Sequence, residues 1–219
     1  MINFLLISAS LHKLKQTMEK GAVFPLFYLP PIAYFSKLSD YRSTVLIEDA
    51  EHFQKQSYRN RASICSSNGR LDLVVPVIKG SKVHTTIKDV KISYDFRWQR
   101  SHWMSLQTCY RSSAYFEYYE DEISDFYQKK WNFLFDYNEE MLALMLKFLK
   151  LNISYSYTDV FEKTYEAFAD FRDCIHPKKD PDMIFKSYFQ VFEEKNGFLP
   201  NLSIVDLLFN QGPQSIKYL

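Results

Sequence analysis

The chain has 219 residues, of which 47% are apolar and 24% charged, and its formal net charge is +1. These values are typical of a globular protein with a sizeable core, and the near-neutral charge argues against a general nucleic-acid binder. Five glycines leave little room for a glycine-rich phosphate loop, and the three cysteines (Cys65, Cys109 and Cys174) fit neither a disulfide framework nor a zinc pattern. We therefore expect a reducing, cytoplasmic compartment, no metal and no cofactor.

The first residues do not resemble a targeting or membrane segment. Residues 2–11 are apolar, but they lack the leading positive charge of a secretory signal and the roughly 20 apolar residues of a membrane span. Met18 is a second candidate start. We expect residues 1–17 to be disordered or to precede the true start, and residues 18–219 to form one domain.

The next stretch predicts a strand, a helix and a second strand. Residues 21–24 are strand-like up to Pro25, residues 32–41 carry apolar side chains at helical spacing, and residues 44–47 are β-branched. A crossover of this length permits parallel pairing. In that arrangement the carboxyl ends of neighbouring strands, where open α/β proteins bind ligands, present three polar residues: Tyr28, Glu48 and Asp49.

A β-hairpin follows, with Asn68-Gly69 as a favoured two-residue turn between strands over residues 58–66 and 70–77. This turn places Ile64 opposite Leu73, and Ala62 opposite Val75, on the apolar face. Alternation along the first strand places Arg59, Arg61 and Ser63 on the other face.

Two neighbouring guanidinium groups that keep their charge are suited to one shared anion or carboxylate. Arg59 and Arg61 are therefore candidate substrate-binding residues. The alternative is structural, with the two arginines paired to Glu48, Asp49 or Glu51. Asn60 lies on the opposite face, where it is either a further substrate contact or a hydrogen-bonded core amide.

The second half of the chain is predicted to be rich in helices. The pattern predicts helices over residues 96–111, 114–126 and 138–151, the last capped by Asn138, and a strand over residues 153–157. It also predicts a helix over residues 185–192 and a capped helix from Ser203, with Asp206 as the capping acid, that ends at Gly212-Pro213. The expected fold is α/β, with α+β as the alternative: a single domain with a small mixed sheet, made of the βαβ unit and the hairpin, and a helix-rich C-terminal half.

Two histidines are candidate general bases, because histidine titrates near neutral pH. His102 lies on a helical stripe with Trp98, Leu106 and Cys109, so a packed core residue is an equally good interpretation. His52 is close in sequence to Asp49 and Glu51 and could form a histidine–carboxylate pair with either. Cys65 and Cys109 are expected to be small buried side chains rather than nucleophiles.

Several of these segments together resemble the WbqC-like protein family. The resemblance covers residues 21–219 and is carried by segments that occur in the family's order: Tyr28-Leu29-Pro30-Pro31-Ile32-Ala33-Tyr34-Phe35, Glu48-Asp49, Gln56-Ser57-Tyr58-Arg59-Asn60-Arg61, Val75-Pro76-Val77, Arg100-Ser101-His102-Trp103 and Leu202-Ser203-Ile204-Val205-Asp206-Leu207-Leu208-Phe209-Asn210. The chain departs from the family at Phe24-Pro25-Leu26, where members often have Gln-Pro-Tyr. Any role of that glutamine is therefore not carried over.

The resemblance implies a bacterial cytoplasmic protein of surface-polysaccharide biosynthesis, with acyl or aminoacyl transfer onto an activated sugar as the expected activity. Arg59, Arg61, Tyr28 and Asn60 would bind an anionic small molecule, either a nucleotide sugar or an acyl thioester. His102 or His52 would take a proton from the acceptor, and Glu48 or Asp49 would orient it. The alternative is a non-catalytic binding module that docks on a biosynthetic protein or on a second copy of the chain.

Overall fold

The computed structural model describes residues 21–41, 44–78, 84–179 and 181–219. The expectation for residues 1–17 lies outside these residues. Among the described helices, none is long and apolar enough to cross a membrane. The elements in chain order are β1 (Gly21–Pro25), α2 (Ile32–Asp40), β2 (Val45–Glu48), β3 (Arg61–Ser66), β4 (Gly69–Val74), η1 (Ile87–Asp89), α3 (Trp98–Tyr110), α4 (Phe116–Gln128), α5 (Leu134–Leu149), β5 (Tyr155–Tyr157), β6 (Phe168–Asp170), α6 (Glu193–Asn196), α7 (Ile204–Gln211) and η2 (Gly212–Tyr218).

The main sheet has four parallel strands in the order β5-β2-β1-β6. The predicted βαβ unit is confirmed, with β1 and β2 adjacent and Phe24 opposite Ile47. The side chains of β1 are buried along the whole strand, as a central parallel strand requires. The sequence did not indicate β6, because its three residues are too few to show a periodic pattern.

The hairpin is confirmed, but its predicted register is wrong by two residues. Ser66 pairs with Gly69, so that Ile64 lies opposite Leu71 and Ala62 opposite Leu73. The turn is therefore Ser67-Asn68, and Gly69 follows it with a φ of 95° that only glycine adopts readily. A shift of two residues preserves the alternation, so the predicted polar and apolar faces are unchanged.

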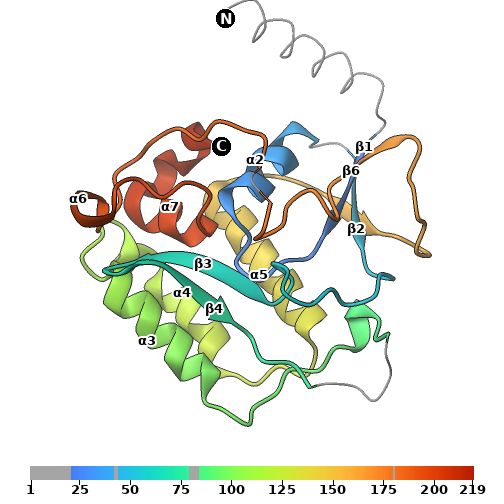
Figure 1. The fold of residues 1–219 in the computed structure, drawn as a ribbon, viewed down its shortest axis with the longest axis horizontal. Coiled ribbons are helices and arrows are strands. Elements are labelled where there is room, and N and C mark those ends of the chain that lie inside the picture. Colours follow the sequence, from blue (N-terminus) through green and yellow to red (C-terminus); the bar gives the residue numbers. More distant parts are fainter. Residues whose placement is uncertain (1–20, 42–43, 79–83, 180) are drawn as a thin grey trace, which may run out of the picture.

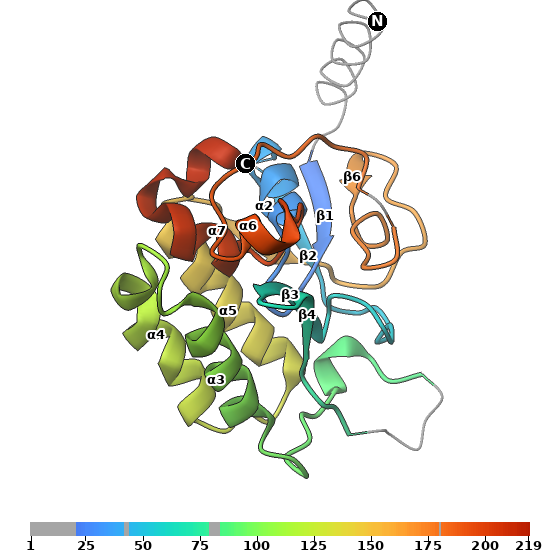
Figure 2. The same cartoon turned by 60° about the vertical axis from the view of Figure 1, so that its left-hand side comes forward.

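Helices α3, α4, α5 and α7 lie on one side of the hairpin in Figure 2, and β1, β2 and β6 lie on the other, with α2 next to β1. The predictions for α3 and α4 are confirmed within two residues, whereas α5 begins four residues earlier than predicted. Asn138 is consequently not a cap. It lies inside α5, fully buried, and donates a hydrogen bond of 2.7 Å to the main-chain carbonyl of Arg59. Cys65 and Cys109 are buried, as predicted.

Residues 183–200 form a segment that we call the strap, which is extended over residues 184–190 and then includes α6, so the helix predicted at residues 185–192 is wrong. Between residues 183 and 190 the buried or half-buried positions are Met183, Phe185, Tyr188 and Gln190, while Ile184 and Phe189 face outwards. This spacing is closer to the two-residue period of extended chain than to a helical stripe. The strap continues through α6, which both views place beside the turn end of the hairpin (Figures 1 and 2), where Asn196 donates to the carbonyl of Ser66.

The strap leads into a connection between the two ends of the described chain. The amide of Ile32 donates to the carbonyl of Leu202, and the amide of Ile204 donates to the carbonyl of Pro30, each at 2.9 Å. The hydroxyl of Ser203 donates to the carbonyl of Leu29. Helix α7 therefore starts against the entry of α2, and the fold is closed by residues far apart in the sequence.

Candidate functional site

The polar face of the hairpin forms the floor of a cleft of about 740 Å³. Strand pairing of Ser63 with Asp72 brings the polar side chains of both strands onto this face. The opposite wall comes from the strap and the chain on either side of it: Pro177, Lys178, Lys179, Pro181, Met183, Phe185, Phe198, Pro200 and Asn201. The cleft therefore joins two parts of the sequence that are more than a hundred residues apart.

The charged side chains among the described lining residues of this cleft are predominantly basic. Four cations face a single carboxylate among the described lining residues: Arg61, Arg70, Lys178, Lys179 and Asp72. A concave surface lined by charges of one sign concentrates the opposite charge. The arrangement therefore favours an anionic ligand.

Arg61 lies at the centre of the basic floor. One of its terminal nitrogens is 3.2 Å from Asp72, whose other oxygen accepts a 2.6 Å hydrogen bond from the Ser63 hydroxyl. The Nε atom of Arg61 is buried and, among the described residues, has no acceptor. The Arg61 side chain is nevertheless 28% exposed, so its terminal nitrogens can donate to a phosphate or carboxylate oxygen in the cleft.

Aromatic and apolar side chains form the remaining surface of the cleft. Tyr58, Met183, Phe185 and Phe198 contribute this surface. Burial raises the pKa of the Tyr58 phenol, so its hydroxyl stays a neutral donor at physiological pH. A ligand with an anionic part and a flat or apolar part matches the two kinds of surface.

Arg59, the other predicted arginine, is separated from Arg61 and is fully enclosed. Its guanidinium forms a two-bond ion pair with Glu51, with both nitrogen–oxygen distances 2.5 Å, and also contacts the side chain of Gln54. Burial raises the pKa of Glu51, and the paired guanidinium opposes that shift. The separation arises because β3 begins at Arg61 rather than at Tyr58, so the strand alternation does not extend back to Arg59.

Glu48 and Asp49 lie at the end of β2, as predicted, but both are buried. Glu48 accepts a 2.9 Å hydrogen bond from Thr158 and a 2.8 Å charged hydrogen bond from Arg172. Asp49 is paired with Lys88. Arg172, which also pairs with Asp170, was not singled out from the sequence; the only local signal was its place in a polar stretch between two predicted elements.

His102 and Tyr28 belong to a buried aromatic cluster. The Tyr28 hydroxyl is 2.9 Å from Nδ1 of His102 and 2.8 Å from the Tyr127 hydroxyl. The ring of Trp98 covers His102 with ring centroids 5.1 Å apart. Burial lowers the pKa of His102 to about 4, only partly opposed by a hydrogen bond with the main chain of Val74. The imidazole is therefore neutral at physiological pH.

His52 and Asn60 lie outside both the basic cleft and the aromatic cluster around His102. His52 is exposed, with its ring 5.0 Å from that of His84, and no described hydrogen bond joins it to Asp49 or Glu51. The Asn60 amide donates to the carbonyl of Val75 at 2.9 Å and so supports the chain after β4. Of the predicted site residues, the structure places only Arg61 in the basic cleft. A search of the described residues finds no group of three or more histidine, cysteine or acidic side chains that could hold a metal ion.

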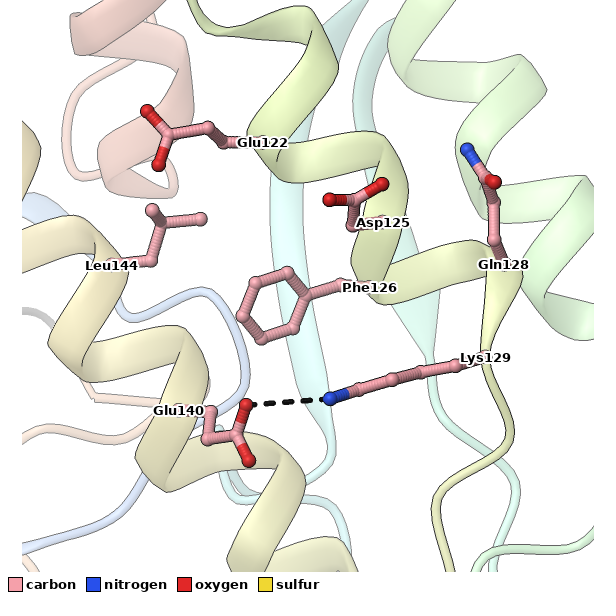
Figure 3. A pocket seen from close by; sticks show the side chains of 7 residues that line it. All are labelled: Glu122, Asp125, Phe126, Gln128, Lys129, Glu140 and Leu144. Carbon is pink, nitrogen blue, oxygen red and sulfur yellow. Dashed lines mark hydrogen bonds and ion pairs between the residues drawn. The ribbon is translucent and has the colours of Figure 1, made fainter.

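A second cavity, of about 560 Å³, lies between α4 and α5 (Figure 3). Phe126 points into it, and Lys129 pairs with Glu140 across it at 3.4 Å. Its described lining has three carboxylates, those of Glu122, Asp125 and Glu140, and one lysine. This charge does not suit an anionic ligand, so the basic cleft is the better candidate site.

Fold and cleft together define an α/β protein with a basic, partly aromatic cleft. The sequence profile of the WbqC-like protein family matches residues 27–171, and the chain belongs to this family. It is also similar to a curated relative from Mycobacterium tuberculosis named "Uncharacterized protein Rv1507c", with 25% identity over 228 residues that cover 92% of this chain and 98% of the relative. No solved structure matches the chain significantly.

Proposed function

We propose that the chain binds an activated anionic metabolite, a nucleotide sugar or an acyl thioester, in the basic cleft, and that it serves acyl or aminoacyl transfer onto an activated sugar. The observation that carries the proposal is the convergence, among the described lining residues, of four cations and one carboxylate on a cleft that also has aromatic walls. Both ligand classes combine phosphates with an aromatic base. The transfer reaction is supported by the resemblance of the sequence to a family linked to surface polysaccharides.

Within this proposal each part of the cleft has a role. Arg61 and Arg70 from the hairpin, with Lys178 and Lys179 from the opposite wall, neutralise the phosphates. Tyr58 and Phe185 contact the flat part of the ligand. Asp72, which is hydrogen-bonded to Ser63, is the carboxylate among the described lining residues and accepts a proton from the incoming hydroxyl or amine.

The test is isothermal titration of the full chain with uridine diphosphate glucose, acetyl coenzyme A, inorganic phosphate and uridine. The first or second should bind, and uridine, which has no phosphate, should not. Arg61→Gln should weaken binding by about 10-fold or more, the scale of a lost hydrogen bond to a charged group. Lys129→Gln, in the cavity between α4 and α5, is the control and should bind like wild type. Equal affinities for Arg61→Gln and wild type would show that the ligand does not bind in the basic cleft.

One observation favours the alternative, a non-catalytic interaction module. Ile184 and Phe189 on the outer side of the strap are 86% and 61% exposed, which is unusual for large apolar side chains. In that case Ile184→Ser/Phe189→Ser should abolish association with a biosynthetic protein or with a second copy, as seen by analytical ultracentrifugation. Ligand binding in the cleft should then be unchanged.

A further inference from the structure

The buried carboxylate of Asp206 has a set of partners that the capping role predicted for it does not explain. Its oxygens accept hydrogen bonds from the hydroxyl of Tyr110 at 2.7 Å, the hydroxyl of Tyr188 at 2.6 Å and the amide of Gln190 at 3.1 Å. The side chain is fully buried, and among the described residues no arginine, lysine or histidine forms an ion pair with it. A buried carboxylate without a cation is costly, so these hydrogen bonds are what makes its position tolerable.

Two of the three donors come from the strap. Tyr188 and Gln190 both reach Oδ2 of Asp206, whereas Tyr110 reaches Oδ1 from α3. Within the described part of the chain, no hydrogen bond involves the main chain of residues 184–189. Among the described residues, the middle of the strap is therefore attached through side chains: Lys186 donates to the main-chain carbonyl of Lys217 at the surface, and the polar attachment to the buried core passes through Asp206.

Gln190 extends this attachment to the far end of the strap. Its amide nitrogen also donates to the carbonyl of Leu199, and its amide oxygen accepts from the main-chain nitrogen of Leu199, both at 2.9 Å. The ring of Tyr188 packs edge-on against Phe198 with centroids 5.3 Å apart. Phe198 and Phe185, on either side of this attachment, both line the basic cleft.

From this geometry we infer that Asp206 is a positioning residue for the cleft: with Tyr188 and Gln190 it forms a latch that holds the strap in place as the cleft's aromatic wall. Asp206 does not touch the ligand. It acts through the strap, so loss of the latch lets Phe185 and Phe198 move away from the basic floor and weakens binding. The link to affinity rests on the proposed function, whereas the attachment of the strap does not.

The two tyrosines offer a matched pair of variants. Tyr188→Phe and Tyr110→Phe each remove one hydrogen bond to the same carboxylate, but only Tyr188 belongs to the strap. Each hydroxyl also accepts one further hydrogen bond, Tyr188 from the Gln190 amide and Tyr110 from the main-chain nitrogen of Cys65. Tyr110→Phe is the harsher change for stability, because the Gln190 amide keeps its bonds to Leu199 and Asp206, whereas the buried main-chain nitrogen of Cys65 loses its acceptor. A purely structural role for the cluster predicts that Tyr110→Phe has the larger effect in every assay.

The first readout needs no ligand. Trypsin cleavage after Lys186, in the middle of the strap, and hydrogen exchange at residues 195–199 are measured for wild type and both variants. In Tyr188→Phe the cleavage rate should rise by about 10-fold, the scale of one lost hydrogen bond to a charged acceptor, while Tyr110→Phe stays within about 2-fold of wild type. Equal rates in the two variants, or no increase in Tyr188→Phe, would overturn the latch.

The second readout is the affinity for uridine diphosphate by isothermal titration. It should fall by about 10-fold in Tyr188→Phe and stay nearly unchanged in Tyr110→Phe, in parallel with the cleavage rates. If the strap opens in Tyr188→Phe while affinity stays at the wild-type value, the link between latch and cleft is wrong. If wild type binds none of the ligands tested for the proposed function, that function fails, and the cleavage assay still decides whether the latch exists.

Discussion

Tyr28 and His102 are 74 positions apart in the sequence, and the Tyr28 hydroxyl lies 2.9 Å from Nδ1 of His102. The two residues that the sequence singled out as a base and a substrate contact are thus each other's partners inside the core. This hydrogen bond joins the segment just before α2 to α3.

We expect His102→Gln to affect stability rather than ligand binding. Glutamine keeps a hydrogen-bonding group but loses the ring contacts with Trp98 and Tyr127, so the melting temperature should fall by several degrees, equivalent to about 1–2 kcal/mol. Thermal unfolding and titration of the folded fraction measure the two effects separately. A variant with wild-type stability and turnover reduced about 10²-fold would instead identify His102 as a general base.

The free energy of unfolding of the wild type should also change with pH, because His102 binds a proton less readily in the folded chain than in the unfolded chain. Its pKa is about 4 in the folded chain, against 6.5 for an unperturbed histidine, so the unfolded chain binds more protons between these values. The contribution of the neutral ring is therefore present above pH 6.5 and is lost as the pH falls towards 4, by up to about 3 kcal/mol. Urea unfolding of wild type and His102→Gln at pH 7 and pH 4.5 measures the difference, and a pH-independent difference would contradict a buried neutral imidazole.

Asp206 should produce a slope of opposite sign in the same pH range. Burial raises its pKa from 3.8 to about 6, although hydrogen bonds from Tyr188, Tyr110 and Gln190 lower it. The folded chain then binds the extra proton, so this contribution is full below pH 3.8 and is lost as the pH rises through 6, by up to about 3 kcal/mol. Relative to Asp206→Asn, wild type should lose stability from pH 4 to pH 6.5 in urea titrations. A gain over that range would mean that the carboxylate is ionised throughout.

The two arginines that bracket Asn60 should behave differently. Arg59 is 1% exposed and paired with buried Glu51, so Arg59→Ala leaves a buried carboxylate alone and should cost about 3–5 kcal/mol. Arg61 is partly exposed, and Arg61→Ala should cost less than about 1 kcal/mol. Urea unfolding of both variants and of Glu51→Gln/Arg59→Ala checks this. Two equally mild variants would show that the Arg59–Glu51 pair is not needed for folding.

Gly212→Ala should be more disruptive than Gly69→Ala. Both glycines have positive φ, 52° and 95°, which costs about 1 kcal/mol for alanine at either position. At Gly212 a Cβ atom would also overlap the ring of Tyr115, whereas at Gly69 it would meet open space. The midpoint of urea unfolding should therefore fall further for Gly212→Ala. Equal midpoints would show that Tyr115 moves aside freely.

The local parts of the fold were predictable from sequence, and the site was mostly not. The βαβ unit and the faces of the hairpin follow from alternation and turn residues within short segments. The hairpin register was not predictable, because the dipeptide Asn68-Gly69 does not decide whether Gly69 lies inside the turn or just after it. In the structure Gly69 follows the turn with a positive φ. Asp206 occupies a position where local pattern favours a capping acid, but its partner Tyr110 is 96 positions away. The cleft is likewise formed by contacts between distant segments, of which Arg61 is the part that the sequence indicated.

The connection of residues 29–33 to residues 201–204 has a consequence for synthesis. While the ribosome is still translating, the entry of α2 has no partner for the main-chain groups of Pro30 and Ile32, because Leu202 and Ile204 emerge much later. Contacts of such large sequence separation form late and slow the folding of a chain. Until then the buried side chains of α2 that face α7 stay uncovered, and exposed apolar surface of this kind is what holdase chaperones recognise.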